Sequence, residues 1–325
     1  MKAIKSLLTS SLMILLLVML HIQVVAAEVN VAFFLEWATP SQIAKVEKTY
    51  DQAIGESVSW HVFSSGGEMT KAMSEGNIDI ALSMGMPPFI TAVNSGIPIK
   101  MVAVAVVYNA NEDCIIRNAT GISKENIQEL AGKKVAVPLN TTAEFVFRMT
   151  MQHLRVDINA MQVMDRAPAD AAFMLLETEV DLACAYGENS LSKMKRVGKP
   201  LLTAQEKKAA GISNVGIISA TETFIRQKPD ALRQFLKVTA DAKSKFSRDA
   251  SNIDLIARDA GLSVEKTKAQ MADFYFPSVE EQLSSYFNDD GIVTRLLPFM
   301  GKMFATDKTP AKNDYRSAVD TSFLK

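Results

Sequence analysis

A strand–turn–helix pattern occurs twice in this chain and places it in the α/β class. In residues 77–89 an apolar strand runs into a turn marked by Pro87 and Pro88, which opens a helix. Residues 134–145 again combine an apolar strand, a polar turn with capping residues and a helix start. Strands alternate with helices over residues 29–220, which predicts mostly parallel sheets with helices on both faces.

Length and the order of these elements predict two lobes. Beyond the last strand the chain is almost entirely helical, with apolar residues at helical spacing. About 300 residues remain after a predicted leader segment, more than one typical core holds. Strands that cross between the lobes are expected at residues 103–117 and 211–219. The first lobe is then discontinuous, residues 28–108 plus 216–325, and the second is residues 109–215.

The N-terminus has the pattern of a secretory signal peptide. Lys2 and Lys5 precede an unbroken apolar run at residues 12–20, and residues 25–27 offer the small side chains of a cleavage site. A membrane anchor is the alternative, but the run is shorter than the roughly 20 residues that span a bilayer. We therefore predict a signal peptide at residues 1–27 and a mature protein outside the cytoplasm.

The net charge excludes some classes of binding partner, and the two cysteines leave two states open. The formal net charge is −1, and it becomes −3 without Lys2 and Lys5, so no basic field favours nucleic acid or anionic lipid. Cys114 and Cys184 both lie in apolar, strand-like runs. A disulfide between them and two buried free thiols are both compatible with the sequence, because spacing alone does not set their Cα distance.

The sequence gives little support for catalysis. After the predicted leader only His61 and His153 remain, and neither lies at a predicted ligand turn. Two isolated histidines make no metal triad and no base for a nucleophile. We expect a protein that is not an enzyme and that has no cofactor and no metal site.

Seven segments spread over nearly all of the mature chain carry a resemblance to a known family. They are residues 31–34, 40–45, 63–69, 76–81, 96–99, 130–138 and 180–186. In this order they resemble the periplasmic substrate-binding proteins of ABC importers, specifically the taurine and aliphatic-sulfonate group of the nitrate, sulfonate and thiamine-precursor-binding superfamily. The resemblance implies a type II periplasmic binding protein fold, with two lobes closing over one small ligand in the interlobe cleft. It also implies a periplasmic protein, expected to be a monomer, that delivers its ligand to an ABC transporter permease.

The two turns supply candidate contacts to an anion. Ser83, Met84 and Gly85 end a strand, where open parallel sheets bind ligands, and Thr141 and Thr142 open the second helix. Helix N-termini present unpaired N–H groups and a positive dipole end to an anion. The alternatives are an ordinary turn and helix capping alone. Neither turn contains Lys or Arg, so neutral dipoles would hold the anion, which suits a permanently ionised sulfonate.

A zwitterion such as taurine needs a second subsite for its ammonium group. Glu36 with Trp37, and Tyr186 with Glu188, each place a carboxylate beside an aromatic ring. The alternative is that both acids are solvated and both rings pack at a lobe edge. Asn214, just before a crossing strand, is a further candidate contact, with a turn role as its alternative.

The position of the amine-binding acid stays open between Glu36 and Glu188. Many members of the group have an aromatic-Asp-Pro sequence after this strand, whereas residues 186–188 here are Tyr-Gly-Glu. We predict capture of taurine or a related aminosulfonate. The alternatives are the same fold with another ligand, namely a thiamine-precursor pyrimidine, nitrate or a carboxylate osmolyte. A less favoured alternative is a pyrimidine-synthesising enzyme, whose cysteine-rich iron site two separated cysteines do not supply.

Overall fold

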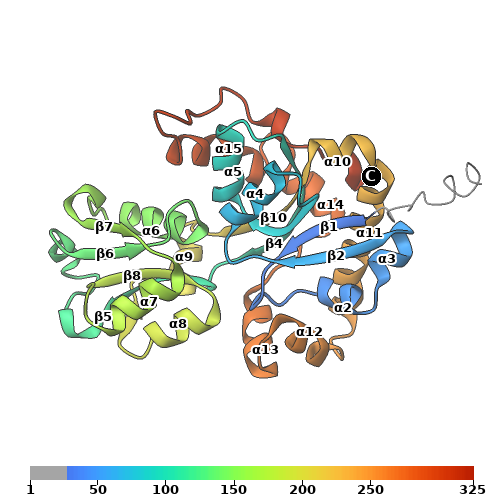
Figure 1. Ribbon diagram of the computed structural model, residues 1–325. Coiled ribbons are helices and arrows are strands. Elements are labelled where there is room, and N and C mark those ends of the chain that lie inside the picture. Colours follow the sequence, from blue (N-terminus) through green and yellow to red (C-terminus); the bar gives the residue numbers. More distant parts are fainter. Residues whose placement is uncertain (1–27) are drawn as a thin grey trace, which may run out of the picture.

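The computed structural model describes residues 28–325, so the predicted signal peptide at residues 1–27 lies outside the described residues. The chain forms two α/β lobes, each built around one five-stranded sheet (Figure 1). The α/β class and the two-lobed organisation predicted from the sequence are confirmed.

The first lobe contains the sheet with strand order β2-β1-β3-β10-β4. Its strands are β1 (Glu28–Phe33), β2 (Ser57–Val62), β3 (Ile80–Gly85), β4 (Ile99–Tyr108) and β10 (Asn214–Thr221). Strands β1, β2 and β3 pair in parallel, and β10 pairs antiparallel with both β3 and β4. One strand, β10, therefore runs against the other four, as expected of a mostly parallel sheet.

The second lobe repeats this arrangement with strand order β7-β6-β8-β5-β9. Its strands are β5 (Glu112–Arg117), β6 (Lys134–Val137), β7 (Gln162–Asp165), β8 (Leu182–Tyr186) and β9 (Gly198–Pro200). Here β5 is the reversed strand, paired antiparallel with β8 and β9, while β6 pairs in parallel with β7 and β8.

Helices cover both sheets. They are α2 (Ser41–Val46), α3 (Thr49–Ile54), α4 (Gly66–Ser74), α5 (Met86–Asn94), α6 (Thr142–His153), α7 (Pro168–Leu176), α8 (Glu188–Met194), α9 (Ala204–Ala209), α10 (Glu222–Gln227), α11 (Pro229–Arg248), α12 (Ile253–Ala260), α13 (Val264–Asp273), α14 (Val279–Glu281) and α15 (Ile292–Met303). The sequence predicts one helix over residues 39–54, but Lys48 adopts a left-handed backbone (φ 55°) and separates α2 from α3. Within residues 28–325, no helix has the length and apolar character to span a membrane.

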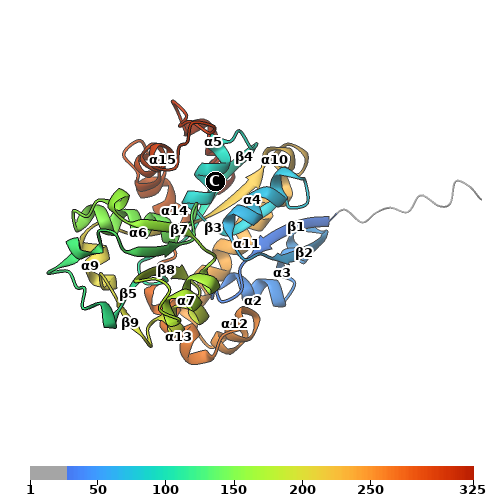
Figure 2. The same ribbon diagram turned by 60° about the vertical axis from the view of Figure 1, so that its left-hand side comes forward.

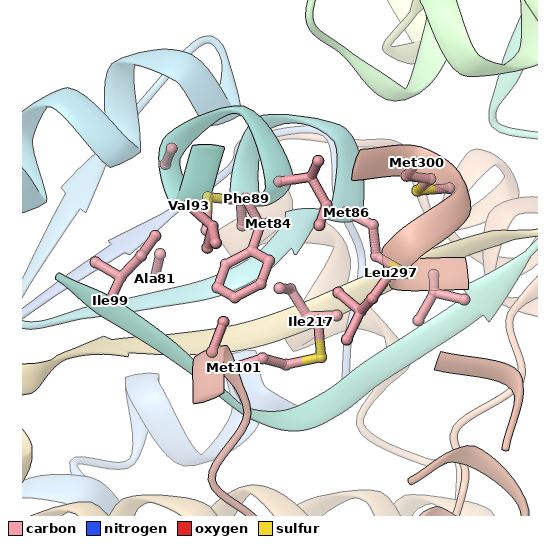
Figure 3. Close-up of a cluster of buried hydrophobic side chains, with 14 of the residues drawn as sticks. Ala81, Met84, Met86, Phe89, Val93, Ile99, Met101, Ile217, Leu297 and Met300 are labelled. Carbon is pink, nitrogen blue, oxygen red and sulfur yellow. The ribbon is translucent and has the colours of Figure 1, made fainter. Parts of the chain in front are cut away.

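Separate apolar clusters fill the two faces of each sheet. On one face of the first sheet, Phe89 of α5 and Leu297 of α15 pack with Met101 of β4 and Ile217 of β10 (Figure 3). The opposite face is covered by α11 and α3, with Phe235 and Tyr50 at its centre. In the second lobe, α6 and α7 cover opposite faces of the sheet (Figure 2). Each lobe therefore has its own core.

The two chain crossings between the sheets are hydrogen-bonded to each other. The chain leaves the first sheet after β4 and returns to it at β10. Asp273 at the end of α13 accepts hydrogen bonds from the backbone N–H groups of Asn109 (2.9 Å) and Ala110 (2.8 Å). The Asn109 amide in turn donates to the carbonyl oxygen of Ile212 (3.0 Å). The lobe boundaries predicted after residues 108 and 215 fall at this junction and stay a prediction.

A disulfide joins β5 to β8. Cys114 and Cys184 are direct partners in the antiparallel register of these strands, and their sulfur atoms are bonded. Both side chains are buried in the core of the second lobe. Of the two possibilities that the sequence leaves open, the structure has the disulfide.

Replacing both cysteines (Cys114→Ala with Cys184→Ala) is expected to lower the free energy of unfolding by about 2–4 kcal/mol. The bond closes a loop with a sequence separation of 70, and its loss gives the unfolded chain more conformational freedom. Urea denaturation with and without reductant measures the effect. Reductant should destabilise the oxidised wild type and leave the double variant unchanged. Two titratable thiols in native protein purified under oxidising conditions would contradict the pairing.

Candidate functional site

A cleft of about 540 Å³ lies between the two lobes. Many of its lining residues follow the carboxyl ends of β1, β2 and β3 in the first lobe and of β6, β7 and β8 in the second. Open α/β sheets bind ligands at this end of their strands. The cleft lining includes these residues predicted from the sequence: Glu36, Trp37, Ser83, Gly85, Thr141, Thr142 and Tyr186.

The N-termini of α5 and α6 face each other across the cleft. Gly85 is the N-cap of α5, and a Cβ atom added to it would lie 2.8 Å from the hydroxyl oxygen of Thr142 at the start of α6. Only glycine therefore allows this approach without displacing Thr142. The two predicted turns are thereby brought together from opposite lobes.

The two helix ends differ in the donors that they offer. In α5 the first turn contains Pro87 and Pro88, which have no backbone N–H, so this end is poorer in donors than an ordinary helix N-terminus. In α6 the first turn keeps the N–H groups of Thr142 and Ala143. The α6 end is consequently the stronger anion receptor of the two.

Thr141 and Thr142 have different tasks. The Thr141 hydroxyl donates to the carbonyl oxygen of Pro138 (2.6 Å) and accepts from the N–H of Glu144 (3.4 Å), so it caps α6. The Thr142 hydroxyl lies beside Gly85 and near the side chains of Tyr108 and Glu112. The capping role belongs to Thr141, which leaves Thr142 as the hydroxyl at the centre of the cleft.

Ser83 occupies a strained position at the cleft wall. In the pairing of β3 with β10, Met84 faces Ile217 and Leu82 faces Ile218, so Ser83 is the extra residue of a β-bulge. Its φ is 63°, a left-handed conformation that non-glycine residues adopt rarely. Bulges and such strain are frequent at ligand sites, where they re-aim a side chain.

An acid that the sequence reasoning missed lies at the floor of the cleft. Glu112 opens β5 and is only 3% exposed. Its carboxylate accepts a hydrogen bond from the Tyr108 hydroxyl (2.7 Å) and another from the Asn214 amide (2.8 Å). Burial raises the pKa of Glu112 to about 8, although the hydrogen bond from Tyr108 opposes this rise. In the sequence, Glu112 is marked only as an acid within the predicted crossing strand at residues 103–117.

The charged side chains of the cleft are acidic. Among the described residues that line it, Glu36 and Glu112 carry carboxylates, and there is no lysine or arginine. Neutral donors complement them. One is the indole N–H of Trp37, which is buried and has no hydrogen-bond partner within residues 28–325. A buried donor without a partner is rare in folded proteins, which makes this N–H a candidate donor to a ligand.

The carboxylate of Glu36 bridges the two lobes. It accepts hydrogen bonds from the backbone N–H (3.1 Å) and the side-chain amide of Asn189, which lies in α8. Nearby, the Tyr186 hydroxyl donates to the carbonyl oxygen of Ser64 (3.2 Å). These contacts hold the lobes together at the rim, and they occupy the acid that the sequence offered as an amine receptor.

Three further predicted residues lie outside the cleft lining. The side chain of Met84 is fully buried in the core beneath α5. Glu188 forms an ion pair with Lys266 (3.3 Å), another contact between the lobes. Asn214 is 1% exposed and reaches the cleft only through its hydrogen bond to Glu112. Among residues 28–325 no group of three His, Cys, Asp or Glu side chains is placed to hold a metal ion.

Comparison with known proteins yields similar sequences and folds. The chain is 22% identical over 247 residues to the taurine-binding periplasmic protein of Escherichia coli (strain K12), a match that covers 74% of this chain and 75% of that protein. The alkanesulfonate-binding protein SsuA from Xanthomonas axonopodis pv. citri, solved with MOPS, has a TM-score of 0.70 at 15% identity, over 90% of this chain and 98% of that one. The nitrate-binding protein NrtA from Synechocystis PCC 6803 has a TM-score of 0.55 at 17% identity, over 74% and 69%.

These likenesses confirm the periplasmic binding protein fold expected from the sequence. A family model described as NMT1/THI5 like matches residues 50–249, which is more than half of the chain. The matched region includes the turns at Gly85 and Thr142, the acid Glu112 and both crossings between the lobes. The chain therefore belongs to the NMT1/THI5-like family.

Proposed function

We propose that this protein captures taurine or a closely related aminosulfonate between its lobes and delivers it to an ABC import permease. The observation that carries the proposal is the charge pattern of the cleft, where neutral donors and a helix N-terminus lie beside two carboxylates. A zwitterion satisfies both kinds of group. Nitrate or a simple alkanesulfonate has no cationic group with which to pair the ionised form of Glu112.

The relatives support this role. Solved proteins named for binding alkanesulfonates share the fold of this chain, and the relative named for binding taurine shares sequence over 75% of its length. They support a binding protein rather than an enzyme. The periplasmic relatives, together with the signal peptide predicted at residues 1–27, support action in the periplasm.

The sulfonate is assigned to the neutral donors. The hydroxyl of Thr142 and the N–H groups at the start of α6 form the centre of this subsite. Ser83 and Trp37 line the same cleft, and the hydroxyl and the unpaired indole N–H are their candidate donors. Fixed dipoles stabilise an anion without the desolvation of a lysine or arginine. A sulfonate suits them because it stays ionised at physiological pH and needs no proton partner.

The ammonium group is assigned to Glu112. Glu36 is held by Asn189, and Glu188 is paired with Lys266 outside the cleft lining. Glu112 faces the cleft next to Thr142, so a ligand with two carbons between its charges reaches both. The nearest cation, Lys207, forms its ion pair with Asp113 (2.6 Å), so the ligand's ammonium would be the direct partner of the Glu112 carboxylate. Charge-assisted hydrogen bonds of this kind are about twice as strong as neutral ones.

Ligand binding is coupled to lobe closure in this account. Thr142 belongs to the second lobe, whereas Trp37 and Ser83 belong to the first. A ligand that contacts both lobes binds the closed arrangement better and shifts the population towards it. The rim contact between Glu36 and Asn189 would then be a closure contact.

A second candidate ligand is a thiamine-precursor pyrimidine. The cleft is lined by more aromatic rings than the sequence predicted, namely Phe34, Trp37, Phe63, Tyr108 and Tyr186. Two of these rings are already engaged in packing. Trp37 contacts Tyr108 edge-on (4.8 Å between centroids) and also packs against Phe274 (4.7 Å). This engagement favours the aminosulfonate.

A thermal-shift screen tests the ligand class. Taurine should raise the melting temperature more than ethanesulfonate, nitrate, an aminopyrimidine or amino acids, because a ligand stabilises the state to which it binds. The screen uses the mature chain from residue 28. Stabilisation by a pyrimidine or by nitrate, with none by any sulfonate, would overturn the assignment.

Mutation of Thr142 should affect ligand affinity, whereas mutation of Thr141 should affect stability. Thr142→Val keeps the side-chain shape and removes the hydroxyl, so we expect at least tenfold weaker taurine binding with an unchanged melting temperature. Thr141→Ala removes the cap of α6 and should lower the free energy of unfolding by about 1 kcal/mol. Calorimetric titration and urea denaturation measure the two effects. Equal affinity of Thr142→Val and wild type would remove Thr142 from the subsite.

Glu112→Gln tests the ammonium subsite. The amide keeps the shape and the cleft-facing position of Glu112 but not its negative charge, so taurine affinity should fall by tenfold or more. Ethanesulfonate, which lacks the amine, should bind the variant at least as well as it binds wild type. Glu188→Gln is the matched control: it removes only an ion pair between the lobes, so it should weaken taurine binding less than Glu112→Gln does. A loss of taurine binding in the control but not in Glu112→Gln would assign the amine to Glu188.

A further inference from the structure

A second cavity, of about 620 Å³, lies in the first lobe on the side covered by α11. It is partly open to solvent and is bordered by α11, by the segment that joins α13 to α14, and by β4 and β10 of the sheet, which are labelled in Figure 1. Among the described residues it shares no lining side chain with the interlobe cleft. Most of its wall is apolar, including Leu236, Phe246, Phe274 and Phe276.

One lysine lines this apolar cavity. The ammonium group of Lys243 donates a hydrogen bond to the backbone oxygen of Val104 in β4 (3.2 Å). An ammonium has three N–H donors, and within residues 28–325 Lys243 forms no ion pair. Burial lowers its pKa to about 7, which reflects the unfavourable surroundings for its charge.

The acids at the cavity wall are engaged elsewhere. Asp241 pairs with Lys237 on the outer side of α11 (2.6 Å). Glu281 accepts hydrogen bonds from the hydroxyl of Tyr275 and the N–H of Ser278 (2.8 Å). Within residues 28–325 neither acid pairs with Lys243, which is the one cation of the cavity wall and is framed by aromatic and aliphatic groups.

We propose that this cavity is a second binding site, for an organic anion with an apolar body such as a medium-chain carboxylate. The carboxylate would pair with Lys243, and the hydrocarbon would lie between α11 and the aromatic segment after α13. Lys243 is partly buried, and a charge without a counter-ion in apolar surroundings is unfavourable, so a ligand carboxylate would reduce that penalty. The volume is within the range of about 300–1,000 Å³ that small-molecule sites occupy.

Lys243 differs from its neighbour on the same helix. Lys245 is exposed, so it provides a matched control for the loss of one positive charge from α11. Lys243→Met keeps the length and apolar character of the side chain and removes the charge. This variant should fold at least as stably as wild type, because it removes a charge from apolar surroundings.

Calorimetric titration with decanoate, and with decanol as the uncharged probe, tests the site. Wild type and Lys245→Met should bind decanoate equally, and Lys243→Met should bind it at least tenfold more weakly, while decanol binding stays the same. Ala240→Phe, which fills the cavity, should abolish the binding of both probes. Saturating taurine should not displace decanoate from wild type.

The proposal is overturned if wild type does not bind decanoate, if Lys243→Met binds it as well as wild type does, or if taurine competes with it. Circular dichroism and urea denaturation establish that each variant is folded. If Lys243→Met is unfolded, Lys243→Gln and Ala240→Phe decide the question with the same two probes.

Discussion

The buried carboxylate of Glu112 connects the two chain crossings between the lobes with the floor of the cleft. Tyr108 ends β4, Glu112 begins β5 and Asn214 begins β10, so its two hydrogen bonds connect both chain crossings. The two crossings lead directly into the reversed strands β5 and β10. The same carboxylate forms part of the cleft floor. Any ligand that changes the charge state of Glu112 therefore acts where the lobes are joined.

The electrostatics of the cleft follow from this placement. Burial disfavours the charged form of Glu112, and the positive charge of Lys207 behind it offsets this effect only in part. The cleft lining itself supplies no lysine or arginine among the described residues. The anion-receptive side instead uses dipoles, chiefly at the N-terminus of α6. A cleft of this kind discriminates by ligand charge pattern: both ends of a zwitterion find partners, whereas a simple anion has no cationic group to pair with ionised Glu112.

Local patterns in the sequence were sufficient for the fold and for one half of the candidate site. The strand-to-helix turns at Ser83 and Thr142 were predicted because strand ends and capping residues are encoded within a few neighbouring positions. The three-dimensional structure was needed to tell which threonine caps α6, since either hydroxyl could have been the cap. The weak donor set of α5 could have been read directly from Pro87 and Pro88.

The acids were harder to assign because their roles depend on distant partners. Glu36 meets Asn189, which is 153 positions away, and Glu188 meets Lys266 in the other lobe. Neither partner is implied by local sequence. Glu112 opens an apolar strand and looks from sequence like a solvated strand end. Its burial follows from the crossing of the chain between lobes, a tertiary property that no local periodicity records.

Proton exchange on ligand binding tests the zwitterion account most directly. Because the pKa of Glu112 is raised to about 8 in the empty cleft, this acid is mostly protonated at pH 7. A ligand ammonium requires its ionised form, so taurine binding at pH 7 should release close to one proton per chain. Calorimetry in two buffers of different ionisation enthalpy measures this number. Release near one proton in wild type, and near zero in Glu112→Gln, is the predicted result. Binding with no proton release, or with proton uptake, would contradict the assignment of the amine to Glu112.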